Sequence, residues 1–304
     1  MNILFALDGS GSSTKAIDHA FTLKCPSGTA LKVVTVVDCF EPFPSLQGVK
    51  EKEVEAARKL VADTVEKLKK VHPEADVSGE VLDGYPTVEI LHCSREWPAH
   101  LIVVGSHGRT GLAELWLGSV SRSVLSHAPC AVRIVRNKVQ DASGPQRVLL
   151  AIDDSEHCEH LIEHVLALPW AEGTHFRCLH VVQEFNSDFS LDSDTGFITT
   201  LAQHYDDQLH SEKKRLSKVV EKIDDAFGLA VASAHVALGD PRKQILEHAA
   251  EWPADLIVIG SHGRQGVEKM LLGSVSEAVA VHAKCAVEVT RMPVKRKAKL
   301  HYII

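Results

Sequence analysis

The sequence predicts an α/β protein made of two tandem domains, each with parallel strands and with helices on both faces of its sheet. Two observations lead to this prediction. Residues 105–136 and 260–291 align without a gap and are identical at 18 of 32 positions, against roughly two expected from average residue usage. In each half, short β-branched runs alternate with segments of helical spacing, which is typical of parallel strands joined by helical crossovers.

The strand-like runs are short, apolar and rich in β-branched residues, as expected of strands buried on both faces. In the first half they are residues 3–8, 31–37, 77–82, 101–105 and 131–135. The helical patterns between them are residues 13–24, 51–71, 87–97 and 119–127. The second half repeats the strands at 148–153, 176–182, 231–237, 256–260 and 286–289.

The length of 304 residues suits two domains, which we place at residues 1–138 and 146–304. The segment between them holds a Ser-Gly-Pro run at 143–145 that interrupts regular structure. The opening strand recurs after 145 residues, whereas the glycine-rich block recurs after 155. We therefore expect about ten extra residues in the second domain, within the polar stretch 186–195.

The composition predicts a cytoplasmic protein with no membrane segment and no nucleic-acid partner. Apolar residues make up 45% of the chain, and no apolar run approaches the span of a membrane helix. Met1 leads directly into an apolar strand, without the features of a secretory signal. The net charge of −7 disfavours binding to nucleic acid. Seven cysteines without a CxxC pair are expected to be buried reduced thiols.

Glycines and small hydroxyls follow the fourth strand of each half in the pattern G-x2-G-x9-G-S. They are Gly105, Gly108, Gly118 and Ser119, then Gly260, Gly263, Gly273 and Ser274. Ligands of parallel α/β sheets bind outside the carboxyl ends of the strands. We expect the glycines to take positive φ and to let the backbone approach a ligand. The N–H groups of the helix that opens at each serine suit phosphate oxygens.

An aspartate ends the first strand of each half, Asp8 in the first and Asp153 in the second. A carboxylate beside phosphates would repel them, so we expect these aspartates to accept hydrogen bonds from ribose hydroxyls. Asp154 adds a further negative charge to the second half. The pattern thus predicts a nucleotide site at the carboxyl edge of each sheet.

The G-x2-G-x9-G-S pattern, the strand-ending Asp-x-Ser and the Val-Val-Asp at 36–38 resemble the universal stress protein family. Two copies in one chain resemble its tandem subclass. The resemblance implies Rossmann-like domains of the adenine nucleotide α-hydrolase type, each with a five-stranded parallel sheet. It also implies that the last strands of the two domains pair into an internal pseudo-dimer. A further homodimer and protein partners stay open.

The resemblance implies a stress-response or regulatory module that binds ATP, with or without Mg2+. It assigns the ribose to Asp8 and Asp153, and the adenine to the main chains of Val36 and Val181. It assigns the phosphates to the loop glycines and the first helical turn. These are Gly105, Gly108, Gly118, Ser119, Val120 and Ser121 in the first domain, and Gly260, Gly263, Gly273, Ser274, Val275 and Ser276 in the second.

We expect no catalytic group and no metal site, because nothing joins a nucleophile to a base or pairs carboxylates at metal spacing. At most, slow ATP hydrolysis or self-phosphorylation on Ser119, Ser121, Ser274 or Ser276 stays open. One alternative is a scaffold of the same fold that holds another small molecule or a protein. The other is an enzyme of the wider α-hydrolase group. Such enzymes normally carry an SGGxDS-type loop, which residues 8–12 lack.

Overall fold

The computed structural model describes residues 1–20, 25, 27–38, 47–108, 117–136, 145–183, 195–228, 230–261 and 272–292. Ten strands within these ranges form one mixed sheet that both domains share. The first domain contributes β1 (Asn2–Leu7), β2 (Ala30–Val37), β3 (Asp76–Asp83), β4 (Leu101–Gly105) and β5 (Ala131–Val135). The second contributes β6 (Arg147–Ala151), β7 (His175–Val182), β8 (Ala232–Leu238), β9 (Leu256–Gly260) and β10 (Ala286–Thr290).

The helices follow the same duplicated order. The first domain has α1 (Gly11–Ala20), α2 (Gln47–Val71), α3 (Pro86–Glu96) and α4 (Ser119–His127). The second has α5 (Glu156–Ala167), α6 (Thr195–Phe227), α7 (Pro241–Glu251) and α8 (Ser274–His282).

The strands expected from the sequence are confirmed, with ends that differ by at most two residues from those of the structure. The second helix starts earlier than expected, at Gln47.

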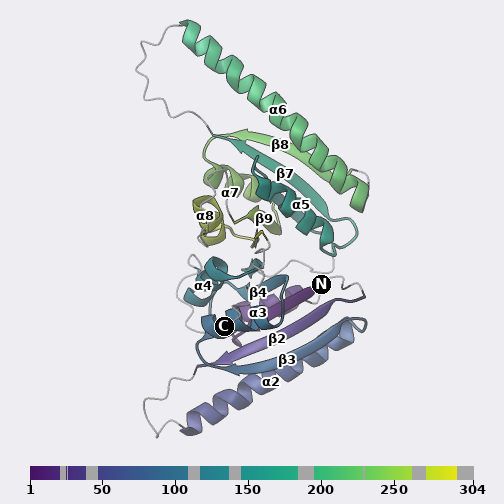
Figure 1. Ribbon diagram of the computed structural model, residues 1–304, viewed down its shortest axis with the longest axis vertical. Coiled ribbons are helices and arrows are strands. Elements are labelled where there is room, and N and C mark those ends of the chain that lie inside the picture. Colours follow the sequence, from purple (N-terminus) through teal and green to yellow (C-terminus); the bar gives the residue numbers. More distant parts are fainter. Residues whose placement is uncertain are drawn as a thin grey trace, which may run out of the picture.

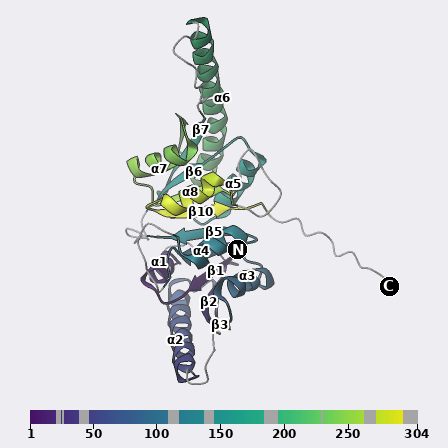
Figure 2. The ribbon, with the colours of Figure 1, turned by 90° about the vertical axis from the view of Figure 1, so that its left-hand side faces the viewer.

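The strand order is β3-β2-β1-β4-β5-β10-β9-β6-β7-β8. Strands within each domain are parallel, and the antiparallel contact lies where β5 meets β10. Figure 2 shows these two strands side by side at the centre of the molecule. The predicted pairing of the last strands is thus confirmed. It joins two five-stranded sheets into one.

Helices cover both faces of the sheet. On one face, α1 and α2 pack over the first domain, and α5 and α6 pack over the second, each pair with its own apolar core. On the other face, buried residues of α3, α4, α7 and α8 belong to one continuous core that crosses the domain boundary. The two domains therefore share apolar packing as well as a sheet.

The two long helices lie at opposite ends of the molecule (Figure 1). α6 has 33 residues and α2 has 25, so α6 is eight residues longer. The extra length was expected within residues 186–195, of which 186–194 lie outside the described residues. Most of the additional length of the second domain is therefore helical. In the described part of the chain, no helix is both long and apolar enough to cross a membrane.

Candidate functional site

The predicted site residues of the first domain gather where β1 and β4 end. These strands are neighbours in the sheet, although β2 and β3 follow β1 along the chain and lie on its other side. The strand order therefore reverses between β1 and β4. Such a reversal opens a crevice outside the carboxyl ends of the strands, where ligands of doubly wound sheets bind.

The loop after β1 is tied to the loop after β4. Asp8 accepts a hydrogen bond from the Ser10 main-chain N–H at 2.9 Å. The Ser10 hydroxyl donates to the His107 carbonyl at 3.3 Å. Gly9 has a φ of 77°, a conformation that favours glycine and lets the chain turn away after Asp8. The turn leaves the Asp8 carboxylate against the next loop, where a Cβ on Gly108 would come within 3.0 Å of its Oδ2.

Gly118 immediately precedes α4 and faces the same loop. Its N–H donates to the Ser106 carbonyl at 2.8 Å. A Cβ on Gly118 would meet that carbonyl oxygen at 3.4 Å and Cα of His107 at 3.5 Å. In the first main-chain hydrogen bond of the helix, the Arg122 N–H donates to the Gly118 carbonyl at 2.9 Å. The N–H groups of the first turn, on Ser119, Val120 and Ser121, thus have no partner within the helix.

The expected positive φ is wrong for all five loop glycines that the structure describes, including Gly260 and Gly273 of the second domain. Gly105, Gly108 and Gly118 all avoid that region, and Gly118 has a φ of −60°. Space explains the glycine at position 105, because a Cβ there would lie 2.9 Å from the Ser12 main-chain carbonyl carbon. Gly105 therefore lets α1 pack closely against the end of β4. At Gly105 the absence of a side chain is required, and not a special backbone conformation.

Ser121 is placed differently from Ser119. The Ser121 hydroxyl is buried and donates to the Gly105 carbonyl at 2.7 Å. In the second domain, Ser276 is also buried and donates to the Gly260 carbonyl at 2.9 Å. Each serine ties the helix on which it lies to the strand before that helix. Ser119, in contrast, is exposed at the start of α4.

The second domain repeats the arrangement where the structure describes it. Asp153 lies two residues after β6 and accepts hydrogen bonds from the Ser155 N–H at 3.1 Å and the Ser155 hydroxyl at 2.5 Å. The Gly273 N–H donates to the Ser261 carbonyl at 2.8 Å. The main-chain bonds of α8 begin with the Glu277 N–H and the Gly273 carbonyl at 2.9 Å. The N–H groups of Ser274, Val275 and Ser276 are therefore presented as in α4. Gly263 lies outside the described residues.

Val36 and Val181 lie beside the two aspartates. The pairing of β1 with β2 runs to Leu7 and Thr35, so Val36 follows the last pair as Asp8 does. Val181 occupies the same place in β7 relative to Asp153. Their main chains therefore border the crevice at the edge nearest β2 and β7.

A charged group behind Asp153 distinguishes the second domain, and the sequence analysis missed it. Arg215 of α6 donates to the Asp153 main-chain carbonyl at 2.8 Å and to the Glu212 carboxylate at 2.7 Å. The first-domain equivalent of Arg215, at the repeat offset of 155, is Leu60. Leu60 faces Gly9, whose Cβ would lie 3.7 Å from the leucine Cδ2. Aligning the two long helices at the same offset of 155 residues would have revealed this difference from the sequence.

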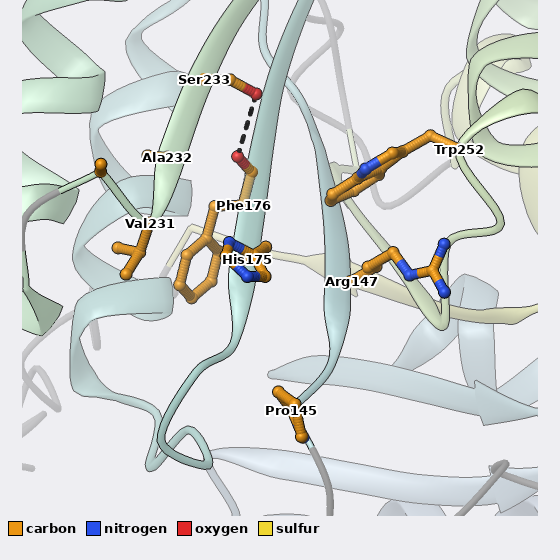
Figure 3. A pocket seen from close by; sticks show the side chains of 9 residues that line it. Pro145, Arg147, His175, Phe176, Val231, Ala232, Ser233 and Trp252 are labelled. Carbon is orange, nitrogen blue, oxygen red and sulfur yellow. Dashed lines mark hydrogen bonds between the residues drawn. The ribbon is translucent and has the colours of Figure 1, made fainter.

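A cavity of about 460 Å³ lies at the opposite edge of the second sheet, where β6, β7 and β8 begin (Figure 3). Phe176, Val231 and Trp252 line it, together with the more polar Arg147, His175 and Ser233. Because it borders the amino ends of the strands, this cavity lies away from Asp153. It contributes nothing to the candidate site.

The described residues contain no cluster of three or more His, Cys, Asp or Glu that would hold a metal ion. The six described cysteines are free thiols. Burial raises the pKa of both Cys130 and Cys285 to about 12. These two thiols are therefore protonated and poorly nucleophilic near neutral pH.

Comparisons with known proteins agree with the duplicated architecture. The universal stress protein family matches residues 1–136 and 145–291. Universal stress protein Rv2005c of Mycobacterium tuberculosis is 30% identical over 301 residues, which cover 95% of this chain and 96% of that protein. Rv1996 of the same organism is 28% identical over 314 residues, covering 96% of each. A crystal structure of a universal stress protein from Archaeoglobus fulgidus shares the fold, with a TM-score of 0.65 at 24% identity, and covers 96% of this chain and 97% of that one.

Proposed function

The chain belongs to the universal stress protein family in its tandem form, and we propose that it is a regulatory module that binds an adenine nucleotide in each domain. The ligand is ATP, with or without Mg2+. The module acts in the cytoplasm, where a partner protein reads whether nucleotide is bound.

The observation that carries this proposal is the juxtaposition of Asp8, Gly108 and Gly118 at the end of β4. The Asp8 carboxylate lies on one side of the loop that follows β4, and the main-chain N–H groups of the first turn of α4 lie on the other. Gly108 and Gly118 place no side chain between them. The N–H groups and the positive end of the helix dipole favour phosphate oxygens. The carboxylate favours hydroxyl donors such as those of ribose. A nucleotide presents both kinds of group along one molecule.

The proposed module has little catalytic activity. Hydrolysis of ATP requires a positioned water and stabilisation of charge at the γ-phosphate. The N–H groups at the start of α4 and α8 offer charge stabilisation, whereas the proposal gives the carboxylates of Asp8 and Asp153 to the ribose and assigns no group as the general base. Of the four serines in the two helical turns, Ser119 and Ser274 are exposed, while Ser121 and Ser276 are buried and donate to carbonyls. Any self-phosphorylation therefore falls on the exposed pair.

The proposal is tested by identifying what the freshly purified chain carries. Mass spectrometry of the released ligand is expected to show an adenine nucleotide. Calorimetric titration of the emptied protein with ATP, in the presence and absence of Mg2+, is expected to give two sites per chain. Release of a different small molecule, with no binding of ATP or AMP, would support the alternative scaffold function.

Two variants assign the sites separately. Gly118→Val and Gly273→Val are each expected to remove one nucleotide per chain, because the added methyl groups project between the helix and the facing loop. Circular dichroism and the unfolding midpoint are expected to stay near those of the parent. Gly11→Val is the control, because a Cβ on Gly11 meets nothing within 4 Å. Unchanged stoichiometry in both site variants would refute the assignment.

A further inference from the structure

Two pairs of equivalent positions in the repeat carry arginine in the first domain and glutamate in the second. They are Arg122 with Glu277 and Arg133 with Glu288, each separated by the repeat offset of 155 residues. Residues that are equivalent in the sequence normally lie far apart in a two-domain chain. Here each pair is in contact, because both positions lie at the approximate two-fold axis that relates the domains.

Arg133 and Glu288 lie on the axis itself. They face each other in the antiparallel ladder of β5 and β10, flanked by the pairs Val132–Val289 and Ile134–Val287. The side chain of Arg133 is 1% exposed and that of Glu288 is not exposed at all. The Arg133 guanidinium donates to the Glu288 carboxylate. This ion pair therefore lies at the centre of the joint between the domains, shielded from water.

The second domain supplies further partners to this pair. His164 of α5 contacts the Glu288 carboxylate through Nε2 at 2.5 Å. The Arg133 guanidinium lies over the ring of Trp170, 6.0 Å from its centroid. Each buried charge thus has an opposite charge and one additional contact.

Arg122 and Glu277 form an outer pair between α4 and α8. The guanidinium and carboxylate are 3.8 Å apart, and both side chains are about half exposed, at 45% and 49%. The arginine again belongs to the first domain and the glutamate to the second. The first domain therefore carries the positive charge and the second the negative charge both at the surface and in the interior of the joint.

Other contacts across the joint are the same in both directions. Arg136, just after β5, donates to the Ala280 carbonyl of α8. Arg291, just after β10, donates to the Leu125 carbonyl of α4. Arg136 and Arg291 are equivalent in the repeat, and so are Leu125 and Ala280. Because both domains carry the arginine, these bonds would also form between two like domains, and they do not choose a partner.

We propose that the opposite charges at positions 133 and 288, assisted by those at 122 and 277, make the joint selective for the unlike domain. Pairing of two first domains from different copies would bury one Arg133 against another. Pairing of two second domains would bury Glu288 against Glu288. Like charges at contact in a low-dielectric interior repel strongly. The joint therefore favours pairing within the chain over like-with-like association between copies.

Single charge reversals in the full chain reproduce these unfavourable pairs. Arg133→Glu places glutamate against glutamate, and Glu288→Arg places arginine against arginine. Each is expected to lower the urea midpoint of unfolding by about 1 to 2 M. The double reversal restores an unlike pair and is expected to recover at least half of that shift. Light scattering reports in parallel whether each variant keeps the molar mass of the parent protein.

Neutral variants separate repulsion from the loss of the pair. Arg133→Gln and Glu288→Gln remove a charge without adding a like one, so each is expected to shift the midpoint less than the corresponding reversal. Neutral and reversed variants with equal midpoints, or a double reversal no better than the sum of the singles, would overturn the proposal.

The outer pair keeps the test decisive if the inner reversals do not fold. Arg122→Glu and Glu277→Arg lie at the surface and are expected to fold. At low salt each is expected to lower the midpoint by a few tenths of 1 M, with recovery in the double reversal. Additive effects of these two changes would count against the proposal, and recovery would support it.

Discussion

A Cβ on Gly108 would come within 3.0 Å of Oδ2 of Asp8, although the two residues are 100 positions apart in the chain. The loop after β4 therefore lies directly over the aspartate that follows β1. This proximity places the residue predicted to bind ribose and those predicted to bind phosphate in one crevice.

Gly108→Val is expected to abolish nucleotide binding in the first domain and to leave the second unaffected. Its side chain would press on the Asp8 carboxylate and enter the space between the loop and α4. Titration calorimetry is expected to show one site per chain in place of two. The second domain acts as an internal control, since its site is remote from the change. Retention of both sites would show that the crevice over Asp8 is not where nucleotide binds.

Asp8→Asn is expected to weaken binding in the first domain by about tenfold, because an ionised acceptor for a ribose hydroxyl is lost. The amide oxygen can still accept from the Ser10 N–H, so the turn is retained. The measurement is made in a Gly273→Val background, which isolates the first site. A 2′-deoxy and a 3′-deoxy nucleotide show which hydroxyl is bound.

The control for this change is Asp18→Asn, because Asp18 is exposed on the neighbouring α1. Equal affinities for the parent and for Asp8→Asn would remove the ribose role from Asp8. If Asp8 has that role, one of the two deoxynucleotides binds the parent less tightly. In the Asp8→Asn variant, the affinities for that deoxynucleotide and for ATP are then expected to be equal.

Ser121→Ala is expected to destabilise the protein by about 1 to 2 kcal/mol, because it leaves the buried Gly105 carbonyl without its hydroxyl donor. Nucleotide affinity is expected to fall by less than tenfold. Ser126→Ala on the same helix is the control, since its hydroxyl bonds only to the Arg122 carbonyl at 3.0 Å. Loss of binding at unchanged stability would instead place the Ser121 hydroxyl on the ligand.

Glu288 is expected to make stability depend on acid pH. Burial by itself would raise the pKa of Glu288, but the charges and hydrogen bonds of Arg133 and His164 outweigh it and lower the pKa from 4.5 to about 2. The stabilisation is therefore fully present above pH 4.5 and is lost as the pH falls from 4.5 toward 2. Urea unfolding across this range is expected to show a smaller pH dependence in Glu288→Gln than in the parent. Identical slopes in the two proteins would contradict the lowered pKa.

Several features were predictable because they depend on local patterns. Short apolar runs rich in β-branched residues placed every described strand of the sheet to within two residues. Repetition of the Asp-x-Ser and G-x2-G-x9-G-S patterns identified the residues that the first domain brings together. The function of the individual groups was less accessible. The phosphate assignments of Gly105 and Ser121 stay predictions, and the structure adds that Gly105 lies against Ser12 of α1 and that the Ser121 hydroxyl donates to the Gly105 carbonyl.

By itself, the sequence determined the duplication, the parallel direction of the strands within each domain, and the positions of the loops at the carboxyl edge, since these arise from periodicity and turn chemistry over short distances. Only the tertiary structure decided which side chains meet. The facing of Arg133 and Glu288 depends on the register of β5 and β10, and the contact of Arg215 with Asp153 depends on how α6 packs. Both join residues more than 60 positions apart, and such contacts are set by packing of the whole chain and leave no short-range pattern in the sequence.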